Sequence, residues 1–164
     1  MATSPPPSDD PLDGISETLD RTASAAIAQT TFGLSPATLL LAMADWGIHL
    51  ATSPGKQMQL GAKAIRKHAR LFDYLQRRME DSEAEPAIEP LPQDRRFADP
   101  AWKELPFNLV AQAFLLNQQW WHAATTGIGG VSKHHEDMVE FAARQMLDML
   151  APTNFLATNP VLQH

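Results

Sequence analysis

Apolar residues recur along this chain at the three- and four-residue spacings of amphipathic helices. The first stripe predicts a helix over about residues 16–30, and its members are Ile15, Leu19, Ala23, Ala26 and Ile27. A second helix is predicted from Ser35-Pro36, because serine can cap free amides and proline is tolerated at the first helical position. Its apolar face comprises Leu39, Met43, Trp46 and Leu50. Val and Ile are sparse and no alternating run is present, so the sequence predicts an all-α fold of about five helices.

A third helix is predicted from Ser53-Pro54 to about residue 80. Its main apolar residues are spaced by seven: Met58, Ile65, Phe72 and Met79. This short, imperfect heptad pattern is typical of a helix that packs against another helix. We therefore expect these four residues, called the heptad row below, to pack against a helix of the same chain or of a second protomer.

The polar side of this third helix is basic. It carries seven of the thirteen positive charges: Lys56, Lys63, Arg66, Lys67, Arg70, Arg77 and Arg78. Such a face can attract phosphates without regard to nucleic-acid sequence. A solvated face, partnered by the acidic stretch that follows, is the favoured explanation. The net charge of −6 also differs from the basic balance of most nucleic-acid binders, so no nucleic-acid partner is expected.

The sign of the charge reverses after this helix. Residues 81–94 mix acidic side chains with three prolines, and prolines at this density exclude a regular helix. We interpret 81–94 as an acidic, proline-rich linker between a helical module at 15–80 and a second helical segment at 95–164. Residues 1–14 are rich in Pro, Ser and Asp and are expected to be disordered.

The second segment is predicted to contain two further helices after a short turn at Asp99-Pro100. One covers about residues 107–125 and is ended by the glycines at 127–130. The other covers about residues 132–150 and is ended by Pro152. The tail from Thr153 has no regular period and is expected to be irregular.

Trp120 and Trp121 are adjacent in the first of these two helices. Neighbouring side chains on an isolated helix cannot both face inward. We therefore expect one of them to be partly exposed and to contact a missing partner domain or a hydrophobic surface.

Composition removes several classes of function. The chain has no cysteine, which excludes disulfides, thiolate metal sites and a cysteine nucleophile. The longest apolar run, residues 39–44, is too short to span a bilayer, and the first residues lack the apolar core of a secretory signal. We expect a cytoplasmic protein that binds no cofactor.

Two motifs resemble chemical sites but have simpler explanations. His134-His135-Glu136 lacks the zinc spacing of two histidines four residues apart, and adjacent helical side chains point about 100° apart. We interpret these residues as a solvated helix start. The glycine-rich stretch 127–130 follows a helix and not a strand, which favours an interhelical turn over a phosphate loop. No Gly-x-Ser-x-Gly turn surrounds any serine.

Charged residues at four-residue spacing continue along the last predicted helix. Glu136 and Glu140 share a face and could suggest paired catalytic carboxylates. The spacings Glu140–Arg144 and Arg144–Asp148 instead predict an exposed ladder of ion pairs.

Two stretches of the chain resemble the N-terminal region of class I poly(3-hydroxyalkanoate) synthases, the polyhydroxybutyrate polymerases. The first contains Leu19-Asp20-Arg21, Gly33-Leu34-Ser35-Pro36, Ala44-Asp45-Trp46-Gly47-Ile48-His49-Leu50-Ala51 and Ser53-Pro54-Gly55-Lys56. The second contains Asp94-Arg95-Arg96-Phe97-Ala98-Asp99-Pro100-Ala101-Trp102, Pro106-Phe107, Trp120, Phe141-Ala142-Ala143-Arg144-Gln145-Met146-Leu147-Asp148, Pro152-Thr153-Asn154-Phe155-Leu156 and Thr158-Asn159-Pro160. Together they cover most of residues 17–164.

The resemblance implies that full-length relatives join 3-hydroxyacyl units from coenzyme A thioesters into polyester. In that family the nucleophile is a cysteine in a Gly-x-Cys-x-Gly turn, assisted by His and Asp. This sequence has no cysteine and no such turn, so no catalytic residue is carried over. The resemblance also implies the roles of the family's N-terminal region, namely dimerisation, stabilisation of the catalytic domain, and contact with the polyester granule and its coat proteins.

The sequence is therefore interpreted as the non-catalytic part of an acyltransferase. The alternative is a free-standing granule-binding or regulatory helical module. The candidate docking or self-association residues are Met58, Ile65, Phe72, Met79, Trp120 and Trp121.

Overall fold

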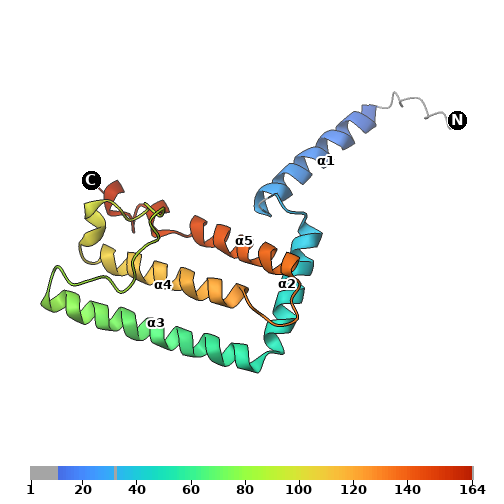
Figure 1. Ribbon diagram of the computed structural model, residues 1–164. Helices are drawn as coiled ribbons and strands as arrows, with labels where there is room; N and C mark the ends of the chain where they lie inside the picture. The colour runs from blue at the N-terminus through green and yellow to red at the C-terminus, as the bar shows by residue number, and fades with distance from the viewer. Residues whose placement is uncertain (1–10, 32, 164) are drawn as a thin grey trace. The chain divides into compact units, whose positions relative to one another are not determined.

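The computed structural model describes residues 11–31 and 33–163, and these form helices without any strand. The predicted all-α class is therefore confirmed. The α-helices of this described part are α1 (Pro11–Thr30), α2 (Pro36–Ala51), α3 (Pro54–Glu80), α4 (Phe107–Thr125) and α5 (Lys133–Met149) (Figure 1). Short 3-10 turns are η1 (Pro100–Lys103), η2 (Pro152–Asn154) and η3 (Pro160–Leu162). The chain divides into two compact units, Met1–Leu40 and Leu41–His164, so the boundary lies within α2 and not within the linker.

The first unit contains α1 and the first turn of α2. α1 begins at Pro11, earlier than the predicted residue 16, because the missing N–H of proline costs nothing at a helix start. Residues 11–14, which we expected to be disordered, are therefore helical. The remainder of that expectation, at 1–10, lies outside the described residues.

The apolar stripe of α1 is not covered within the first unit. Ile15 and Leu19 are 57% and 65% exposed. The side chain of Ile27 lies outside the described part of the chain. The predicted stripe is thus present on the helix, but its described members contribute no buried core.

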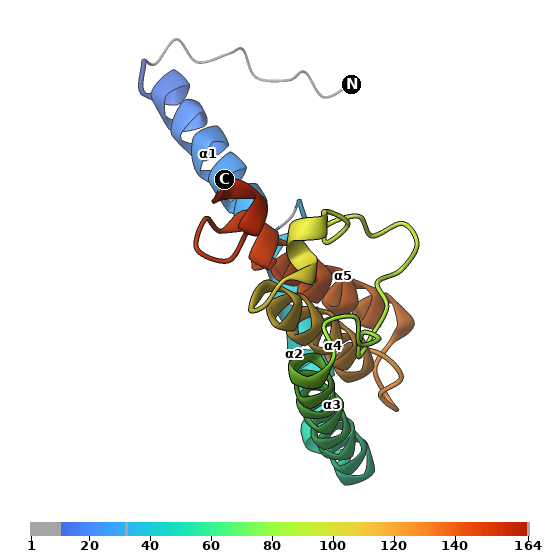
Figure 2. The same ribbon diagram turned by 90° about the vertical axis from the view of Figure 1, so that its left-hand side faces the viewer.

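α4 is the central helix of the second unit. It lies between α3 and α5 in both views (Figures 1 and 2). It supplies much of the core through Ala111, Phe114, Leu115, Leu116 and Ala124. α5 adds Met138, Val139 and Ala142. A helix contacted on two sides needs a wide apolar face, which explains the broad apolar pattern of residues 107–125.

The acidic linker is non-helical, as its prolines predicted, but it packs onto the second unit. Ala87 is buried beside Tyr74 of α3. The side chain of Gln112 accepts a hydrogen bond from the Ile88 N–H (2.7 Å) and donates one to the Ile88 carbonyl (3.0 Å). This pair satisfies both backbone groups of a partly buried linker residue. The linker therefore ties α3 and α4 together and does not separate two domains.

An aromatic cluster closes the end of the unit at η1. Trp102 is only 3% exposed and meets the rings of Phe97 and Phe107 edge-on, with centroids 4.8 Å and 6.3 Å away. The tail, which was expected to be irregular, forms η2 and η3 and buries Pro152 and Pro160. The tail therefore belongs to the packed unit.

Gly130 should resist substitution, because it has a φ of 93° and a Cβ placed there would lie 2.3 Å from a ring carbon of His49. Gly130→Ala should lower the free energy of unfolding by about 1–3 kcal/mol. Gly129→Ala is the matched control, because nothing lies within 4 Å of its Cβ position. Urea unfolding followed by circular dichroism compares the two, and equal losses would contradict the account of this turn.

Candidate docking surface

The heptad row lies exposed on the outer side of α3. Met58, Ile65, Phe72 and Met79 are 77%, 72%, 62% and 74% exposed. Of the two environments expected for the row, packing within the chain is therefore not observed among the described residues. α3 instead packs on α4 through another face, centred on Leu60, Leu71 and Tyr74. Packing of the row against a second protomer stays a prediction.

The two neighbouring tryptophans are half-buried and point to different sides of α4. The Trp120 indole N–H donates to the Leu60 carbonyl on α3 (3.0 Å). Trp120 also lines a cleft of about 570 Å³ between α3 and α4, whereas Trp121 lines a separate groove between α4, α5 and the linker. The two rings meet edge-on with centroids 5.5 Å apart. Both are partly exposed, as expected for at least one, and contact with a further partner stays a prediction.

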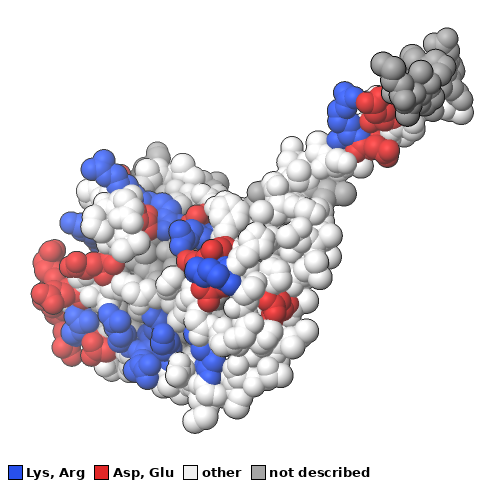
Figure 3. Space-filling model, turned by 45° about the vertical axis from the view of Figure 1, so that its right-hand side comes forward, with Lys and Arg blue, Asp and Glu red and all other residues white. Residues whose placement is uncertain are grey.

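Basic side chains of α3 hold neighbouring segments through backbone carbonyls. Lys56 donates to the carbonyl of Thr126 (2.7 Å), and Arg77 donates to that of Glu85 (2.9 Å). Arg70 and Arg78 donate to the carbonyls of Ala87 and Lys103. Figure 3 shows Lys and Arg side chains gathered at the lower edge of the molecule, where α3 lies in Figure 1. The linker therefore partners this basic face, as expected, and it does so through the backbone carbonyls of Glu85 and Ala87.

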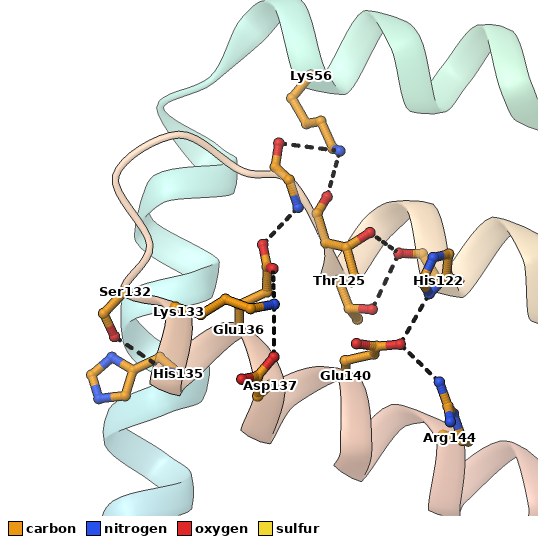
Figure 4. A network of polar contacts seen from close by, with 12 residues as sticks. Lys56, His122, Thr125, Ser132, Lys133, His135, Glu136, Asp137, Glu140 and Arg144 are labelled. Carbon is orange, nitrogen blue, oxygen red and sulfur yellow. Dashed lines mark hydrogen bonds and ion pairs between the residues drawn. The ribbon is translucent and has the colours of Figure 1, made fainter.

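A polar network joins the 127–130 turn to the start of α5 (Figure 4). Ser132 caps α5 by accepting from the His135 N–H (3.2 Å). The Glu136 carboxylate accepts from the Gly127 N–H (2.6 Å) and from Lys133 (3.0 Å). These two contacts, with Lys133 the larger cause, lower the pKa of Glu136. The prediction of a helix start at this point is confirmed, and the glycines form an interhelical turn.

Asp45 connects α2 to α5 within the second unit. Its two carboxylate oxygens lie 2.9 Å from His49 Nδ1 and 2.6 Å from His135 Nδ1. The contact with His135 is the main cause that lowers the pKa of Asp45. No local pattern predicts this contact, because Asp45 and His135 are 90 residues apart in the chain.

The charge ladder of α5 is only partly as predicted. Glu140 and Arg144 form an ion pair of 2.8 Å, which confirms the first step. Asp148, the predicted partner of Arg144, instead forms an ion pair of 2.8 Å with Arg96, which lies between α3 and η1. Arg96 also binds Asp94 at 2.6 Å and lowers the pKa of that carboxyl. Arg96, which belongs to the second stretch that resembles the synthases, thus fastens the end of the linker to α5.

Stability should fall in acid because of these contacts. The pKa values of Asp45, Asp94 and Glu136 are lowered, so below about pH 4 the unfolded chain binds protons that the folded chain does not. The contribution of these ionised carboxylates to the free energy of unfolding is present near neutral pH. It is lost as the pH falls through their lowered folded-state pKa values. Asp94→Asn should therefore flatten the fall in urea midpoint between pH 7 and pH 3, whereas Glu104→Gln, at an exposed carboxylate, should not. If the urea midpoint of the Asp94→Asn variant fell with pH as steeply as that of the unsubstituted chain, Asp94 would not contribute to the loss of stability in acid.

No group of three or more side chains suited to a metal ion occurs among the residues that the structure describes. Within residues 11–31 and 33–163, no helix is long and apolar enough to cross a membrane.

Comparison with known families confirms the resemblance seen in the sequence. A family model described as poly-beta-hydroxybutyrate polymerase N terminal matches residues 14–56. A second, described as the N-terminus of poly-beta-hydroxybutyrate polymerase (PhaC), matches residues 93–164. This chain has the N-terminal region of a poly-beta-hydroxybutyrate polymerase. Neither match includes residues 57–92, so the whole heptad row lies between the two matched regions.

The chain is also similar in sequence to curated poly(3-hydroxyalkanoate) polymerases. The poly(3-hydroxyalkanoate) polymerase of Methylorubrum extorquens is 34% identical over 110 residues, which are 66% of this chain and 18% of the relative. The polymerase subunit PhaC of Cupriavidus necator is 35% identical over 127 residues, 70% of this chain and 21% of the relative. The chain thus spans about a fifth of these two relatives. No solved structure matches it.

Proposed function

We propose that this chain is the non-catalytic docking part of a polymerase that joins 3-hydroxyacyl units from coenzyme A thioesters into polyester. In this proposal it supports dimerisation, stability of the catalytic domain, and association with polyester granules and their coat proteins in the cytoplasm. The observation that carries the proposal is the heptad row, whose four large apolar side chains are 62–77% exposed.

The row has the properties of an uncovered helix-packing surface. From Met58 to Met79 it extends roughly 30 Å along α3, because each helical residue adds about 1.5 Å. The opposite face of α3 packs on α4, so the row is not needed for the core of the second unit. An exposed row of large apolar side chains of this length suits an amphipathic helix of a partner. We propose a second copy of the chain as that partner.

A second apolar surface lies in the tail. Phe155, Leu156, Val161 and Leu162 are 46%, 66%, 45% and 55% exposed on and beside the turns η2 and η3. We propose that this surface contacts the catalytic domain of the polymerase. The separation of the two surfaces lets dimerisation and catalytic-domain support be tested independently.

Domain replacement tests the proposal in the presence of a catalytic domain. The N-terminal region of the Cupriavidus necator polymerase would be replaced by this chain, with and without Ile65→Glu and Phe72→Glu. The proposal predicts that the unsubstituted chimera is dimeric and makes polymer, and that the substituted chimera is monomeric and makes less. A substituted chimera with undiminished dimerisation and synthesis would contradict the docking role of the row.

The alternative is a free-standing module that binds granules or regulates them. The same exposed apolar residues favour it, because hydrophobic attraction to a polyester surface needs no catalytic domain. Binding of the isolated chain to polyester particles should then persist in high salt. Binding to nucleic acid through the basic face of α3 would instead be lost steeply as salt rises.

A further inference from the structure

The heptad row of α3 alternates with a second row that lacks large apolar side chains. This intervening row consists of Ala62, Ala69 and Gln76, and the two rows together recur at spacings of four and three residues. Such spacing places both rows on one seam of the helix, since a heptad drifts by only about 20° around the axis. Ala69 and Gln76 are exposed and Ala62 is half-buried. The accessible seam of α3 therefore alternates large and small apolar side chains along most of its length.

Two copies of this seam fill space best when they run in opposite directions. In a parallel pair, equivalent positions face each other. Ala69 would then face the partner's Ala69 and leave space unfilled, while Phe72 would face the partner's Phe72. In an antiparallel pair, each position of the heptad row faces a position of the intervening row. Each alanine then receives a large side chain, and the alanines let the two helices approach closely.

Charged residues beside the seam select one antiparallel register. Arg66 and Asp73 each follow a member of the heptad row and lie on the same edge of the seam. In one register, Ala69 faces the partner's Ile65, and Arg66 then lies against the partner's Arg66. In the next register, Ala69 faces the partner's Phe72. Arg66 then lies against the partner's Asp73, and charges of opposite sign at this edge favour that register.

The two charged side chains are accessible for such a contact. Arg66 is exposed, and Asp73 is 67% exposed although it pairs with Arg77 within α3. Figures 1 and 2 show α3 at the edge of the second unit, where its seam can meet another molecule. The row and its flanking charges therefore carry a self-complementary pattern of size and sign.

We propose that α3 forms an antiparallel pair with α3 of a second copy, with a two-fold axis beside residues 70 and 71. Across such an axis each contact occurs twice, so Arg66 pairs with the partner's Asp73 and Asp73 with the partner's Arg66. Ala62 faces the partner's Met79 at each end of the seam. This inference rests on the proposed function, which names a second copy as the partner of the heptad row, and it adds the direction and the register of that contact.

Disulfide cross-linking of the full chain tests the arrangement, because the chain has no cysteine of its own. Ala62→Cys combined with Met79→Cys should give a covalent dimer on mild oxidation, since the two positions face each other across the interface. Each single variant should stay uncross-linked, because its cysteine lies roughly 25 Å from its own copy at about 1.5 Å per residue. The same separation along one helix prevents a bond within the chain. Electrophoresis without reductant measures the result.

Two cross-linking patterns would overturn the inference. Covalent dimers from both single variants would show a parallel pair. A covalent dimer from Ala62→Cys with Phe72→Cys, and none from Ala62→Cys with Met79→Cys, would show the other antiparallel register.

Exchange of charges tests the register without cysteine. Arg66→Glu should weaken the dimer about tenfold, because it replaces two attractive contacts by repulsive ones. Arg66→Glu combined with Asp73→Arg restores opposite charges across the interface and should recover most of the affinity. Lys63→Glu is the matched control, because it makes the same change of charge at an exposed position outside the seam and should leave the dimer nearly unchanged. Equal weakening by Arg66→Glu and Lys63→Glu, or no recovery in the exchanged variant, would refute the pairing.

Failure of this inference can be told apart from failure of the proposed function. A chain that dimerises through the heptad row in sedimentation velocity, but cross-links in another pattern, keeps the docking role and loses only the antiparallel arrangement. A chain that stays monomeric at every concentration removes the proposed dimerisation as well.

Discussion

Replacement of Trp102 by alanine should lower the free energy of unfolding by about 3–5 kcal/mol, the range for a large buried aromatic side chain. Trp102 is 3% exposed and packs edge-on against Phe97 and Phe107. Its turn η1 contacts both α4 and η3, so the cavity would loosen the tail as well as the central helix. The loss is large compared with the total stability of a domain, which is about 5–15 kcal/mol.

Urea unfolding followed by circular dichroism at fixed temperature measures this effect without relying on tryptophan fluorescence. Trp121→Ala is the control, because Trp121 is half-buried and its indole N–H has no acceptor in the described part of the chain. Its loss should be under about 2 kcal/mol. Similar losses for the two variants would mean that η1 is not a structural centre of the second unit.

Charged substitutions in the heptad row should leave the stability of the folded chain nearly unchanged and should weaken its self-association. Ile65→Glu combined with Phe72→Glu should change the free energy of unfolding of the separated chain by no more than about 0.5 kcal/mol for each site, because both side chains are mostly exposed. Self-association should weaken by at least about 100-fold, since each carboxylate would be buried without a partner at the interface.

Gln59→Glu is a suitable control for the row variant. Gln59 is exposed on the same helix but lies about 100° around its axis from Met58, outside the heptad row, and the substitution adds a negative charge without removing apolar surface. It should affect neither folding nor association strongly. A row variant that unfolds would show that the row belongs to the core of the monomer, contrary to its observed exposure.

Local sequence signals predicted much of the helical framework. The starts of α2 and α3 at Pro36 and Pro54 follow the Ser-Pro pairs, and α4 has the predicted bounds. At Ser53, however, the side chain donates to the His49 carbonyl and makes no capping bond to α3. The start position was thus predicted correctly, while the expected capping contact was not present.

The buried face of α3 could not be predicted from apolar residue types alone. The heptad row holds four strongly apolar residues, yet the packed face combines Leu60, Leu71 and Tyr74 with long basic side chains. Such side chains can lie against a neighbouring helix through their methylene groups while their charged ends reach carbonyls, and hydropathy counts them as polar. The heptad pattern therefore predicted an apolar face correctly, but it could not show that this face lies on the outside of the described chain.

The packing of the linker onto the second unit depends on contacts between residues that are distant in the sequence. The reciprocal bond of Gln112 with Ile88 and the ion pair of Arg96 with Asp148 join residues 24 and 52 positions apart. Neither follows a helical spacing. They explain why a proline-rich acidic stretch, interpreted from composition as a linker, is part of the packed unit.

Sedimentation velocity over a series of protein concentrations tests the docking role of the heptad row most directly. The unsubstituted chain should shift from monomer to dimer as its concentration rises. The chain with Ile65→Glu and Phe72→Glu should remain monomeric over the same range and unfold at the same urea concentration. If both chains form the same dimer, or if the unsubstituted chain is monomeric at every concentration, the row does not mediate self-association.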